Sequence, residues 1–556
     1  MDNERITAIE KLSQPGMDYE IVPGEVWGRP CRLFRNAPLT LRDLYQDANS
    51  DETFLVFEDE RYTFSETNNR VAQIANVLFD KYGVRKGDRV AISMRNYPEW
   101  VFAFNAVTSI GAIAVAMNSL WVSEEMEFGL RDSGAKVLLA DEERLVRLEA
   151  FRQSIDLAVI SVRATTKRTN IASLEELISL GVSKRLPDVK IEPSDLATIL
   201  YTSGSTGHPK GATSCHLNII SALLSWELDA KIGQLISGSE PPKLDYQISA
   251  LLSVPLFHAT GSHAVMLASY RAQRKIVLMH KWDVLVAQKL IEQEKVAVFI
   301  APAAMTGDLE RAARTSKRDL SSLLTVGGGG APRAPDQVKK IAGTFKKALP
   351  NTGWGMTETN AIGAGISGED YVDHPGSSGR VSALLDIRVL DEWGKELPAL
   401  ERGELQIRGA SIIKGYWERE EANNEAFDGE WLKTGDVGYI DNQGYVYIVD
   451  RIKDLVIRGG ENIGCAEVEA GLLAHPNINE ASVYAVPDER LGEEVGATIF
   501  SAEAVDEEEL RDFLLDHIAR FKVPRYLSIS ANPLPRIASG KIDKRRIRAD
   551  FISGLE

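Results

Sequence analysis

Cysteine is scarce in this 556-residue chain. Its three cysteines, Cys31, Cys215 and Cys465, stand far apart without any paired spacing. Zinc knuckles and disulfide frameworks need several cysteines at short intervals, so the sequence predicts neither. The scarcity suits a reducing compartment. Because the N-terminal residues Met1–Arg5 carry acids and lack the apolar run of a signal peptide, we expect a cytoplasmic protein.

Positive charge is also in deficit. Lys and Arg together number 64 against 80 Asp and Glu, so the formal net charge is −16. A field of this sign repels phosphate backbones and anionic lipid, which argues against nucleic acid as a partner. An anionic small molecule would have to be held by a few locally placed cations.

Long apolar runs are rare, and the exception is the uncharged stretch 100–122, which is long enough to span a bilayer. Asn105, Thr108 and Ser109 interrupt it, Gly111 lies near its middle, and neither flank has the excess of Lys and Arg that orients membrane helices. The stretch therefore predicts a buried helix followed by a buried strand, without a membrane span.

The composition that remains, 44% hydrophobic and 26% charged, is typical of a globular protein with three or four folding units. Between residues 89 and 326, short and continuously apolar runs alternate with helix-length segments. Such runs form mostly parallel sheets that are covered on both faces, so we predict an α/β fold. The runs are 89–94, 136–140, 196–200, 275–278, 296–300 and 323–326.

Turn-separated strands follow residue 387, among them 403–409 and a hairpin of 437–440 with 445–449. The final hundred residues indicate a small α+β unit, whose clearest helix, 507–521, has Asp506 as its N-cap. We therefore predict a large multi-layer N-terminal body, residues 1–450, with a β-rich subdomain at about 380–450, and a small mobile C-terminal cap, residues 451–556.

The most informative segment is the loop Tyr201–Ala212, YTSGSTGHPKGA, which directly follows the apolar run 196–200. Its glycines let backbone N–H groups approach an anion, its hydroxyls add donors, and Lys210 adds a cation, which together suit a polyphosphate. The Walker spacing is absent, so the loop is not a P-loop. Taken alone, such a loop is as often a flexible surface connection.

This loop resembles the signature of the adenylate-forming superfamily, which includes acyl-CoA synthetases, coumarate:CoA ligases, beetle luciferases and peptide-synthetase adenylation domains. Six further segments resemble the superfamily's motifs in the same order, and the resemblance covers roughly residues 39–548. The segments are Leu256–Gly261, Gly327–Pro332, Gly353–Glu358, Trp431–Asp436, Asp450–Asp454 and Pro535–Lys541.

The resemblance implies a two-step ligation by an acyl-CoA synthetase of the fatty-acid:CoA ligase type. A small-molecule carboxylic acid and ATP, with Mg²⁺, would give an acyl-adenylate and pyrophosphate, and the acyl group would then pass to coenzyme A. A carboxylate is a poor acyl donor because its leaving group would be oxide, whereas the mixed anhydride with AMP has a good one. The oligomeric state stays open, with a homodimer as one option.

By resemblance, the functional residues divide according to the part of the substrates that they would touch. Those at the β- and γ-phosphates would be Thr202, Ser203, Gly204, Ser205, Thr206, Gly207 and Lys210. Thr357 would bond the α-phosphate, and Glu358 would hold Mg²⁺. Those lining the nucleotide slot would be Gly328, Gly329, Ala331, Pro332, Gly353, Trp354, Gly355 and Met356. Asp436 would accept the ribose hydroxyls, and Arg451 would pair with ribose or phosphate.

Three residues of the C-terminal part would act through movement. Lys541 would bridge the carboxylate and the α-phosphate during adenylation. Lys453 matches the hinge on which the small domain turns between the two half-reactions, and Gly460 would then keep the thiol tunnel open. Without the resemblance, Lys541 would be read as part of a solvated tail and Lys453 as an ordinary linker lysine.

Two positions bear on the acid. Where amino-acid-activating members commonly have Asp, this chain has His258, which would leave a substrate ammonium unpaired and which resembles a gate between acyl pocket and thiol tunnel. Where acetyl-CoA synthetases have Trp, it has Gly355, which leaves space for a longer acyl group. A medium- to long-chain fatty acid is the first expectation, and an aryl acid, or transfer to a separate carrier protein, is the alternative. A luciferase-like oxygenase and an inactive scaffold are less favoured.

Overall fold

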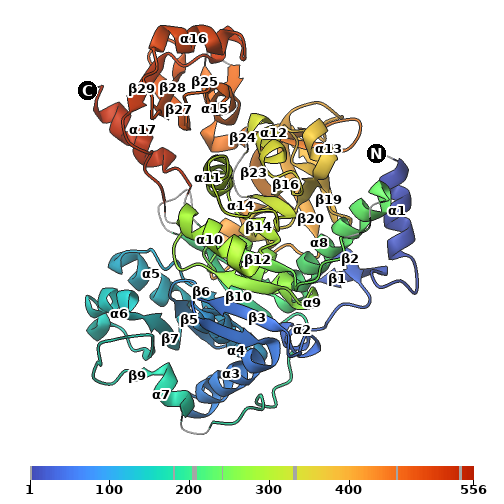
Figure 1. Cartoon of the computed structure of the whole chain (residues 1–556), viewed down its shortest axis with the longest axis vertical. Coiled ribbons are helices and arrows are strands. Elements are labelled where there is room, and N and C mark those ends of the chain that lie inside the picture. The colour runs from blue at the N-terminus through green and yellow to red at the C-terminus, as the bar shows by residue number, and fades with distance from the viewer. Residues whose placement is uncertain are drawn as a thin grey trace.

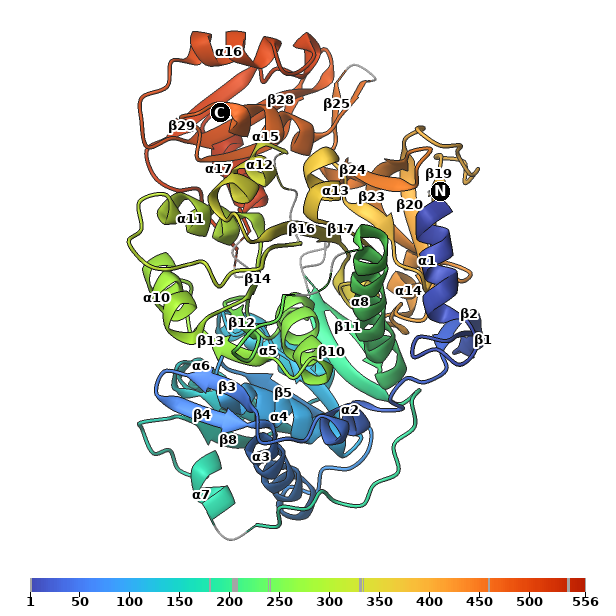
Figure 2. The same ribbon diagram turned by 45° about the vertical axis from the view of Figure 1, so that its right-hand side comes forward.

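The chain folds around an eight-stranded and a fourteen-stranded β-sheet, with a five-stranded sheet in its C-terminal part, in a computed structural model (Figure 1). The structure describes residues 3–179, 182–202, 209–238, 240, 242–329, 333, 335–458, 461–537 and 541–555. The C-terminal part lies at one end of the molecule, next to α11 (Ala303–Ala313) and α12 (Pro335–Thr344) (Figures 1 and 2). The expected α/β class, with a large N-terminal part and a smaller α+β part, is confirmed.

The eight-stranded sheet is parallel from β10 to β9 and ends in two antiparallel strands, in the order β21-β11-β10-β6-β5-β7-β8-β9. Val90 and Ile92 pack into a core shared with α4, whereas Ala91 between them packs on the other face against α5 and α6. Helices thus cover both faces, as the continuous apolar runs predict. The elements are β5 (Arg89–Ser93), β6 (Ile113–Ala116), β7 (Val137–Asp141), β8 (Ala158–Val162), β9 (Ala172–Ser173), β10 (Leu196–Thr202), β11 (Lys210–Cys215), β21 (Gly415–Tyr416), α4 (Pro98–Ser109), α5 (Ser123–Ser133) and α6 (Glu142–Glu149).

The uncharged stretch 100–122 forms a buried helix and a buried strand, as expected. Every residue of α4 is buried, and β6 lies in the middle of the sheet. No helix among the described residues has the length and apolarity needed to cross a membrane.

The fourteen-stranded sheet has a parallel half and an antiparallel half. Strands β16, β15, β14, β12, β13 and β3 run parallel. The sheet continues antiparallel through β17, β18, β24, β23, β20 and β19, and β4 pairs antiparallel with β3 at the other edge. The β-rich region expected at 380–450 is therefore an extension of this sheet. The expected hairpin is confirmed, within longer strands. The strands are β3 (Thr53–Phe57), β4 (Glu60–Thr63), β12 (Ser249–Leu252), β13 (Lys275–Leu278), β14 (Val298–Ile300), β15 (Thr325–Gly329), β16 (Leu349–Trp354), β17 (Ala364–Ser367), β18 (Gly379–Val381), β19 (Leu385–Leu390), β20 (Gly403–Gly409), β22 (Phe427–Asp428), β23 (Trp431–Ile440) and β24 (Tyr445–Arg451).

The C-terminal part packs three helices on a five-stranded sheet. Asp506 caps α16 as expected, since its carboxylate accepts the Glu509 N–H, but the predicted extent of this helix is wrong: α16 ends at Leu515 and a separate 3₁₀ turn follows. Beyond Leu515 the apolar Ile518 still packs on the same core, so the apolar pattern continues past the end of the helix and suggested a longer one. The elements are β25 (Val456–Arg458), β26 (Glu461–Ile463), β27 (Glu480–Asp488), β28 (Gly492–Phe500), β29 (Tyr526–Ser530), α15 (Cys465–Ala474), α16 (Glu507–Leu515), η6 (Arg520–Lys522) and α17 (Lys544–Ser553).

The remaining elements surround the two large sheets. Among them, α8 lies beside α1 along one side of the N-terminal part (Figure 2). They are α1 (Asn3–Ser13), β1 (Ile21–Val26), β2 (Arg29–Phe34), α2 (Leu41–Asp47), α3 (Phe64–Asn76), η1 (Val77–Lys81), η2 (Arg152–Ser154), α7 (Leu174–Ser179), α8 (His216–Ser237), η3 (Thr260–Leu267), α9 (Ala268–Arg271), α10 (Val284–Glu294), η4 (Thr357–Thr359), α13 (Gly368–Asp373), α14 (Glu420–Ala426) and η5 (Ile452–Asp454).

Candidate functional site

A cavity of about 3320 Å³ joins the N-terminal and C-terminal parts of the chain. It lies at the carboxyl ends of the parallel strands β15 and β16, where ligands of α/β sheets usually bind. Most of the expected site residues that the structure describes line it: Thr202, His258, Gly328, Gly329, Gly353, Trp354, Gly355, Met356, Thr357, Glu358, Asp436, Arg451 and Lys541. Outside the described residues are Ser203, Gly204, Ser205, Thr206, Gly207, Ala331, Pro332 and Gly460, together with the side chain of Lys453.

Strands β10 and β11 position the two described ends of the glycine-rich loop. Thr202 lies directly opposite Lys210 in this antiparallel pair, and its hydroxyl donates to the Lys210 carbonyl oxygen at 3.4 Å. Lys210 is not part of the cavity lining, but its ammonium group lies over the ring of Tyr416 at 5.3 Å. Tyr416 belongs to β21, the strand next to β11, so the Lys210 ammonium is held beside the cavity by the neighbouring strand.

Glu358 lies in the 3₁₀ turn η4, and its side chain is largely buried, with 6% exposed. The turn is closed by Thr359, whose hydroxyl oxygen accepts the Met356 N–H. The Tyr416 hydroxyl donates to Glu358 Oε1 at 2.8 Å. Burial and the Glu358 charge both raise the pKa of Tyr416, so this hydroxyl stays protonated and keeps donating at neutral pH.

Tyr416 was not identified from the sequence, because a lone tyrosine in a Gly-Tyr dipeptide carries no chemical signal. We expect Tyr416→Phe to slow the acyl-adenylate formation that the sequence resemblance implies about tenfold, since a hydrogen bond to a charged carboxylate contributes about 1.5–3 kcal/mol. Pyrophosphate release measured over a range of Mg²⁺ concentrations would test this. An unchanged rate at all Mg²⁺ concentrations would show that the bond has no role in the reaction.

Asp436 is fixed on both of its carboxylate oxygens. Arg451 lies directly opposite it in the β23–β24 pair, and Arg451 Nε contacts Asp436 Oδ1 at 2.9 Å. The indole N–H of Trp354 donates to Asp436 Oδ2 at 2.7 Å, and the carboxylate is buried, with 4% of the residue exposed. A carboxylate held in this way is pre-oriented to accept further hydrogen bonds from a ligand in the cavity.

Lys541 brings the C-terminal part into the same cavity. Its carbonyl oxygen accepts the Ile537 N–H at 2.9 Å. The side chain is exposed to the cavity, yet surrounding protein and the nearby Arg451 lower the pKa of the ammonium, and Asp436 opposes this shift. The Lys541 ammonium therefore lies near both Asp436 and Arg451 in the cavity lining.

His258 lines the same cavity and lies close enough to Lys541 to be affected by its charge. Its Nε2 is buried and has no hydrogen-bond partner among the described residues. Burial, together with the Lys541 charge, lowers the pKa of His258 to about 3, so the imidazole is neutral at physiological pH. A ring nitrogen without a partner among the described residues does not fit a fully hydrogen-bonded core histidine.

A second buried histidine should make folding sensitive to acid. Burial lowers the pKa of His263 to about 3, so between this value and about 6.5 the unfolded chain binds more protons than the folded one. Its stabilising effect is complete above about pH 6.5 and is lost on acidification. At pH 5 the free energy of unfolding should be about 2 kcal/mol below its value at pH 7 because of this group alone.

Urea unfolding of the wild type and of His263→Gln at pH 7, 6 and 5 tests this. Glutamine does not titrate and could still bond the Ser262 hydroxyl, which lies 2.8 Å from His263 Nδ1. The variant should lose less stability between pH 7 and pH 5 than the wild type does. If the wild type and the variant lose the same free energy of unfolding between pH 7 and pH 5, the acid sensitivity does not come from His263.

The glycines have a packing role that the sequence did not reveal. A Cβ at Gly355 would lie 2.5 Å from the carbonyl oxygen of Ala361, and one at Gly327 would lie 2.2 Å from that of Asn351. Main chain therefore approaches main chain at these points, and any side chain would displace a neighbouring segment. Glycine at position 355 is explained by this contact, so it does not by itself measure the length of the acyl pocket.

An apolar arm of the cavity extends between α8, the segment η3–α9 and β14. The same elements also contribute polar lining residues, among them Glu227, Asp229, Lys231 and Gln234 of α8 and Arg271 of α9. The apolar lining residues are Leu223, Trp226 and Ala230 of α8, Ala264 of η3, Ala268 of α9, and Val298 and Ile300 of β14. An extended apolar group fits this lining.

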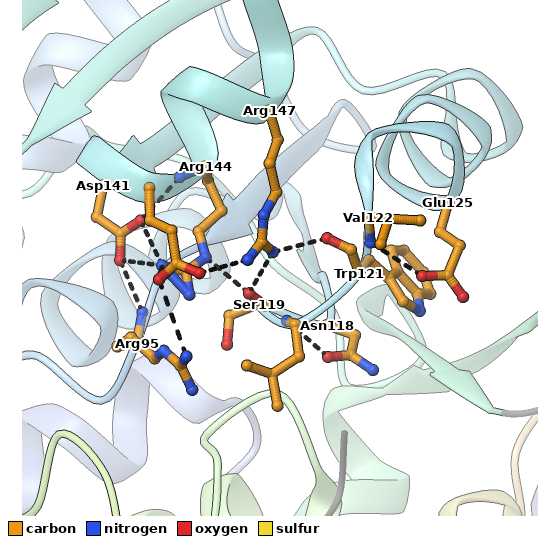
Figure 3. A network of polar contacts seen from close by, with 11 residues as sticks. Arg95, Asn118, Ser119, Trp121, Val122, Glu125, Asp141, Arg144 and Arg147 are labelled. Atoms are coloured by element: carbon orange, nitrogen blue, oxygen red, sulfur yellow. Dashed lines mark hydrogen bonds and ion pairs between the residues drawn. The ribbon is translucent and has the colours of Figure 1, made fainter. Parts of the chain in front are cut away.

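Another wall of the cavity is a loop that two arginines hold by its carbonyl groups (Figure 3). Arg144 Nε donates to the Ser119 carbonyl oxygen at 2.7 Å, and Arg147 Nη1 donates to those of Ser119 and Trp121 at 2.9 and 2.6 Å. The N-cap Asp141 pairs with the buried Arg144 at 2.9 Å. The loop, which contributes Asn118, Leu120, Trp121 and Val122 to the lining, is therefore firmly positioned.

Two family models match the chain: AMP-binding enzyme over residues 45–417, and AMP-binding enzyme C-terminal domain over residues 467–541. The chain is 32% identical over 494 residues to a 2-succinylbenzoate--CoA ligase of Bacillus velezensis and 31% identical over 494 residues to a long-chain-fatty-acid--CoA ligase of Mycobacterium tuberculosis. Each match covers 89% of this chain and 94% of the relative.

The fold agrees with these relatives. The o-succinylbenzoate CoA synthetase of Bacillus subtilis, solved in complex with its acyl-adenylate intermediate, matches with a TM-score of 0.78 and 28% identity over 92% of this chain and 98% of that one. The resemblance to adenylate-forming enzymes is thereby confirmed. The chain belongs to the AMP-binding enzyme family and is an enzyme of the carboxylic acid:CoA ligase type.

Proposed function

We propose that the protein joins a medium- to long-chain carboxylic acid to coenzyme A in two steps, through an acyl-adenylate and with loss of pyrophosphate. The observation that carries the proposal is the convergence of Lys541, Arg451, Asp436 and Glu358 on one cavity that also opens into an apolar arm. Cations and a carboxylate suit the nucleotide, and the apolar arm suits the acyl group. The two remote parts of the chain that supply them have to meet for the first step.

In the first step, the carboxylate of the acid attacks the α-phosphorus of ATP, and the bond to pyrophosphate breaks. Lys541 neutralises negative charge on both reactants, and Asp436 holds the ribose hydroxyls, so that binding places the reacting atoms together. Thr357 bonds the α-phosphate. Thr202 and Lys210, at the ends of the glycine-rich loop, hold the departing phosphates.

Glu358 suits a magnesium site. Tyr416 engages only one of its carboxylate oxygens by a hydrogen bond. Since no cluster of three or more His, Cys, Asp or Glu that could hold a metal is found in the described part of the chain, most ligands of Mg²⁺ would be phosphate oxygens and water, which is how this ion is usually bound. When bound, Mg²⁺ would offset charge that develops on the phosphates.

In the second step, the thiol of coenzyme A replaces AMP on the acyl carbon. Lys541 has to leave for the thiol to enter, and we place the hinge for this movement at Lys453, between a body of residues 1–450 and a cap of residues 451–556. In the pose described, Lys541 lines the cavity whereas Val456–Arg458 do not. This pose suits adenylation, and rotation would bring Val456–Gly460 to the pantetheine chain.

A panel of fatty and aryl acids, assayed for AMP release with and without coenzyme A, tests the proposal. Coenzyme A should be consumed in proportion to AMP, and extended acids should be preferred to benzoates. AMP release that does not respond to coenzyme A would instead favour transfer to a carrier protein. Preference for benzoates would favour an aryl-acid:CoA ligase.

A further inference from the structure

The lining of the apolar arm includes Arg274, a cation whose charge is not paired with any described carboxylate. Arg274 lies between α9 and β13 and lines the cavity, and its guanidinium has no hydrogen bond or ion pair with any described residue. Protein surrounds it closely enough for burial to lower the pKa of Arg274, and Glu227 opposes this shift only from a distance. Arg274 keeps intermediate exposure and opens onto the cavity, so a partly desolvated cation without a bonded partner is placed to bind an anion that enters.

Glu227 cannot serve as that partner because it is already bound. Arg271 Nε donates to both of its carboxylate oxygens, at 2.8 and 2.9 Å. The Tyr19 hydroxyl donates to Oε2 as well, at 3.3 Å. The carboxylate of Glu227 is therefore satisfied by another arginine, and Arg274 remains free to bond a group that enters the arm.

The strand register shows how far Arg274 lies from the reaction centre. Arg274 precedes β13 by one residue, and the chain of pairings through β12, β14, β15 and β16 places it six residues below the level of Gly353. Six residues of parallel strand span about 20 Å, part of which the arginine side chain itself covers. A ligand that reaches both Lys541 and Arg274 therefore needs a long spacer.

We propose that the acid carries a second anionic group, a carboxylate at the end remote from the reacting carboxyl, and that Arg274 binds this group. The inference rests on the proposed acid activation and narrows its substrate class to long-spaced dicarboxylic acids. A carboxylate would take two parallel hydrogen bonds from the guanidinium fork. The apolar walls between the two ends would hold the methylene chain. Short dicarboxylic acids would be excluded because they cannot span the arm.

The experiment compares matched acids of about 8 to 14 carbons with the wild type, Arg274→Met and Arg274→Lys. For each length, the dicarboxylic acid is paired with the monocarboxylic acid and with the dicarboxylic acid monomethyl ester. Pyrophosphate release gives kcat/KM, and calorimetric titration without ATP gives binding. Thermal unfolding of Arg274→Met serves as the folding control, and its midpoint should not fall, because an apolar side chain replaces an unpaired charge.

The wild type should prefer the dicarboxylic acid at least about tenfold over both paired acids at the best length. Arg274→Met should lose this preference through a KM effect and leave the monocarboxylic acid unaffected or improved, and Arg274→Lys should retain part of it. Equal activity on the three acids in the wild type would overturn the inference, as would equal losses of activity on all three in Arg274→Met. Either result would leave the proposed acid:CoA ligase activity standing.

Absence of ATP turnover with every acid would instead contradict the proposed function. In that case the calorimetric titration without ATP still shows whether Arg274 binds the second carboxylate. Binding of the dicarboxylic acid that Arg274→Met weakens at least about tenfold would support the subsite, and binding that the substitution leaves unchanged would refute it.

Discussion

Lys541→Ala is expected to lower the rate of acyl-adenylate formation by about 10²- to 10³-fold, the usual effect of removing a group that stabilises charge in the transition state. The side chain stands in the cavity near Asp436, Arg451 and His258. The other lysines whose side chains the structure describes in the C-terminal part are paired, Lys522 with Glu467 at 2.5 Å and Lys544 with Glu469 at 3.0 Å, so neither is free to replace it. The second half-reaction does not need this cation and should survive.

Separate assays of the two half-reactions measure this effect. Pyrophosphate exchange follows the first step, and thioester formation from supplied acyl-adenylate follows the second. Arg546→Ala is the matched control, because Arg546 is an exposed cation of α17 whose ion pair with Asp550 is loose, at 3.7 Å. Loss of both steps in Lys541→Ala, with intact folding, would contradict the role given to this residue.

Lys453→Pro should have the opposite effect: thioester formation falls by at least about 10²-fold, and adenylation is spared. Residue 453 lies in the single 3₁₀ turn η5, where the chain leaves β24 and enters the C-terminal sheet. Proline fixes φ at about −65° and also restricts the residue before it, so it hinders the backbone rotation that the second pose requires.

Lys453→Ala is the control for this substitution. It removes the same side chain but leaves the backbone free to rotate, so both half-reactions should proceed. If Lys453→Pro transfers the acyl group to coenzyme A at the wild-type rate, the hinge does not lie at this residue. If Lys453→Ala is as impaired as Lys453→Pro, the side chain rather than the backbone rotation is responsible.

The contacts around this hinge show what rotation would break. The Asp450 carboxylate accepts the Ala466 N–H at 3.2 Å, at the start of α15. Burial raises the pKa of Asp450, and the Lys544 ammonium opposes this shift. The end of β24 is thus tied to two helices of the C-terminal part in the pose described, and release of these contacts is part of the cost of changing pose.

The sequence predicted much of the fold because its signals are local. Continuous apolar runs appeared as the buried parallel strands β5, β7, β10 and β13, and the uncharged stretch 100–122 appeared as α4 and β6. Helix ends were less predictable. The apolar period that suggested a helix to residue 521 continues past Leu515, because a turn can present side chains to the same core as a helix.

The site could be predicted only to the extent that its residues lie in motifs. Lys541, Asp436, Arg451 and Glu358 were identified by resemblance, and the structure brings them to one cavity. Tyr416 and Arg274 were not identified, since neither belongs to a motif. The role of each residue depends on a bonded partner or a cavity that segments far away in the chain provide.

By itself the sequence determined that this is an α/β protein of the adenylate-forming type, because motif order and strand pattern are properties of the chain read along its length. Only the tertiary structure decided which groups are buried and what they face. In the tertiary structure Tyr416 donates a hydrogen bond to Glu358, and burial keeps His258 neutral in the cavity lining. The carbonyl oxygen of Ala361 lies so close to Gly355 that no side chain fits there. The tertiary structure also leaves Arg274, which is partly exposed on the lining of the apolar arm, without a bonded partner among the described residues. Desolvation and the pairing of charges depend on packing between distant segments, which no local pattern records.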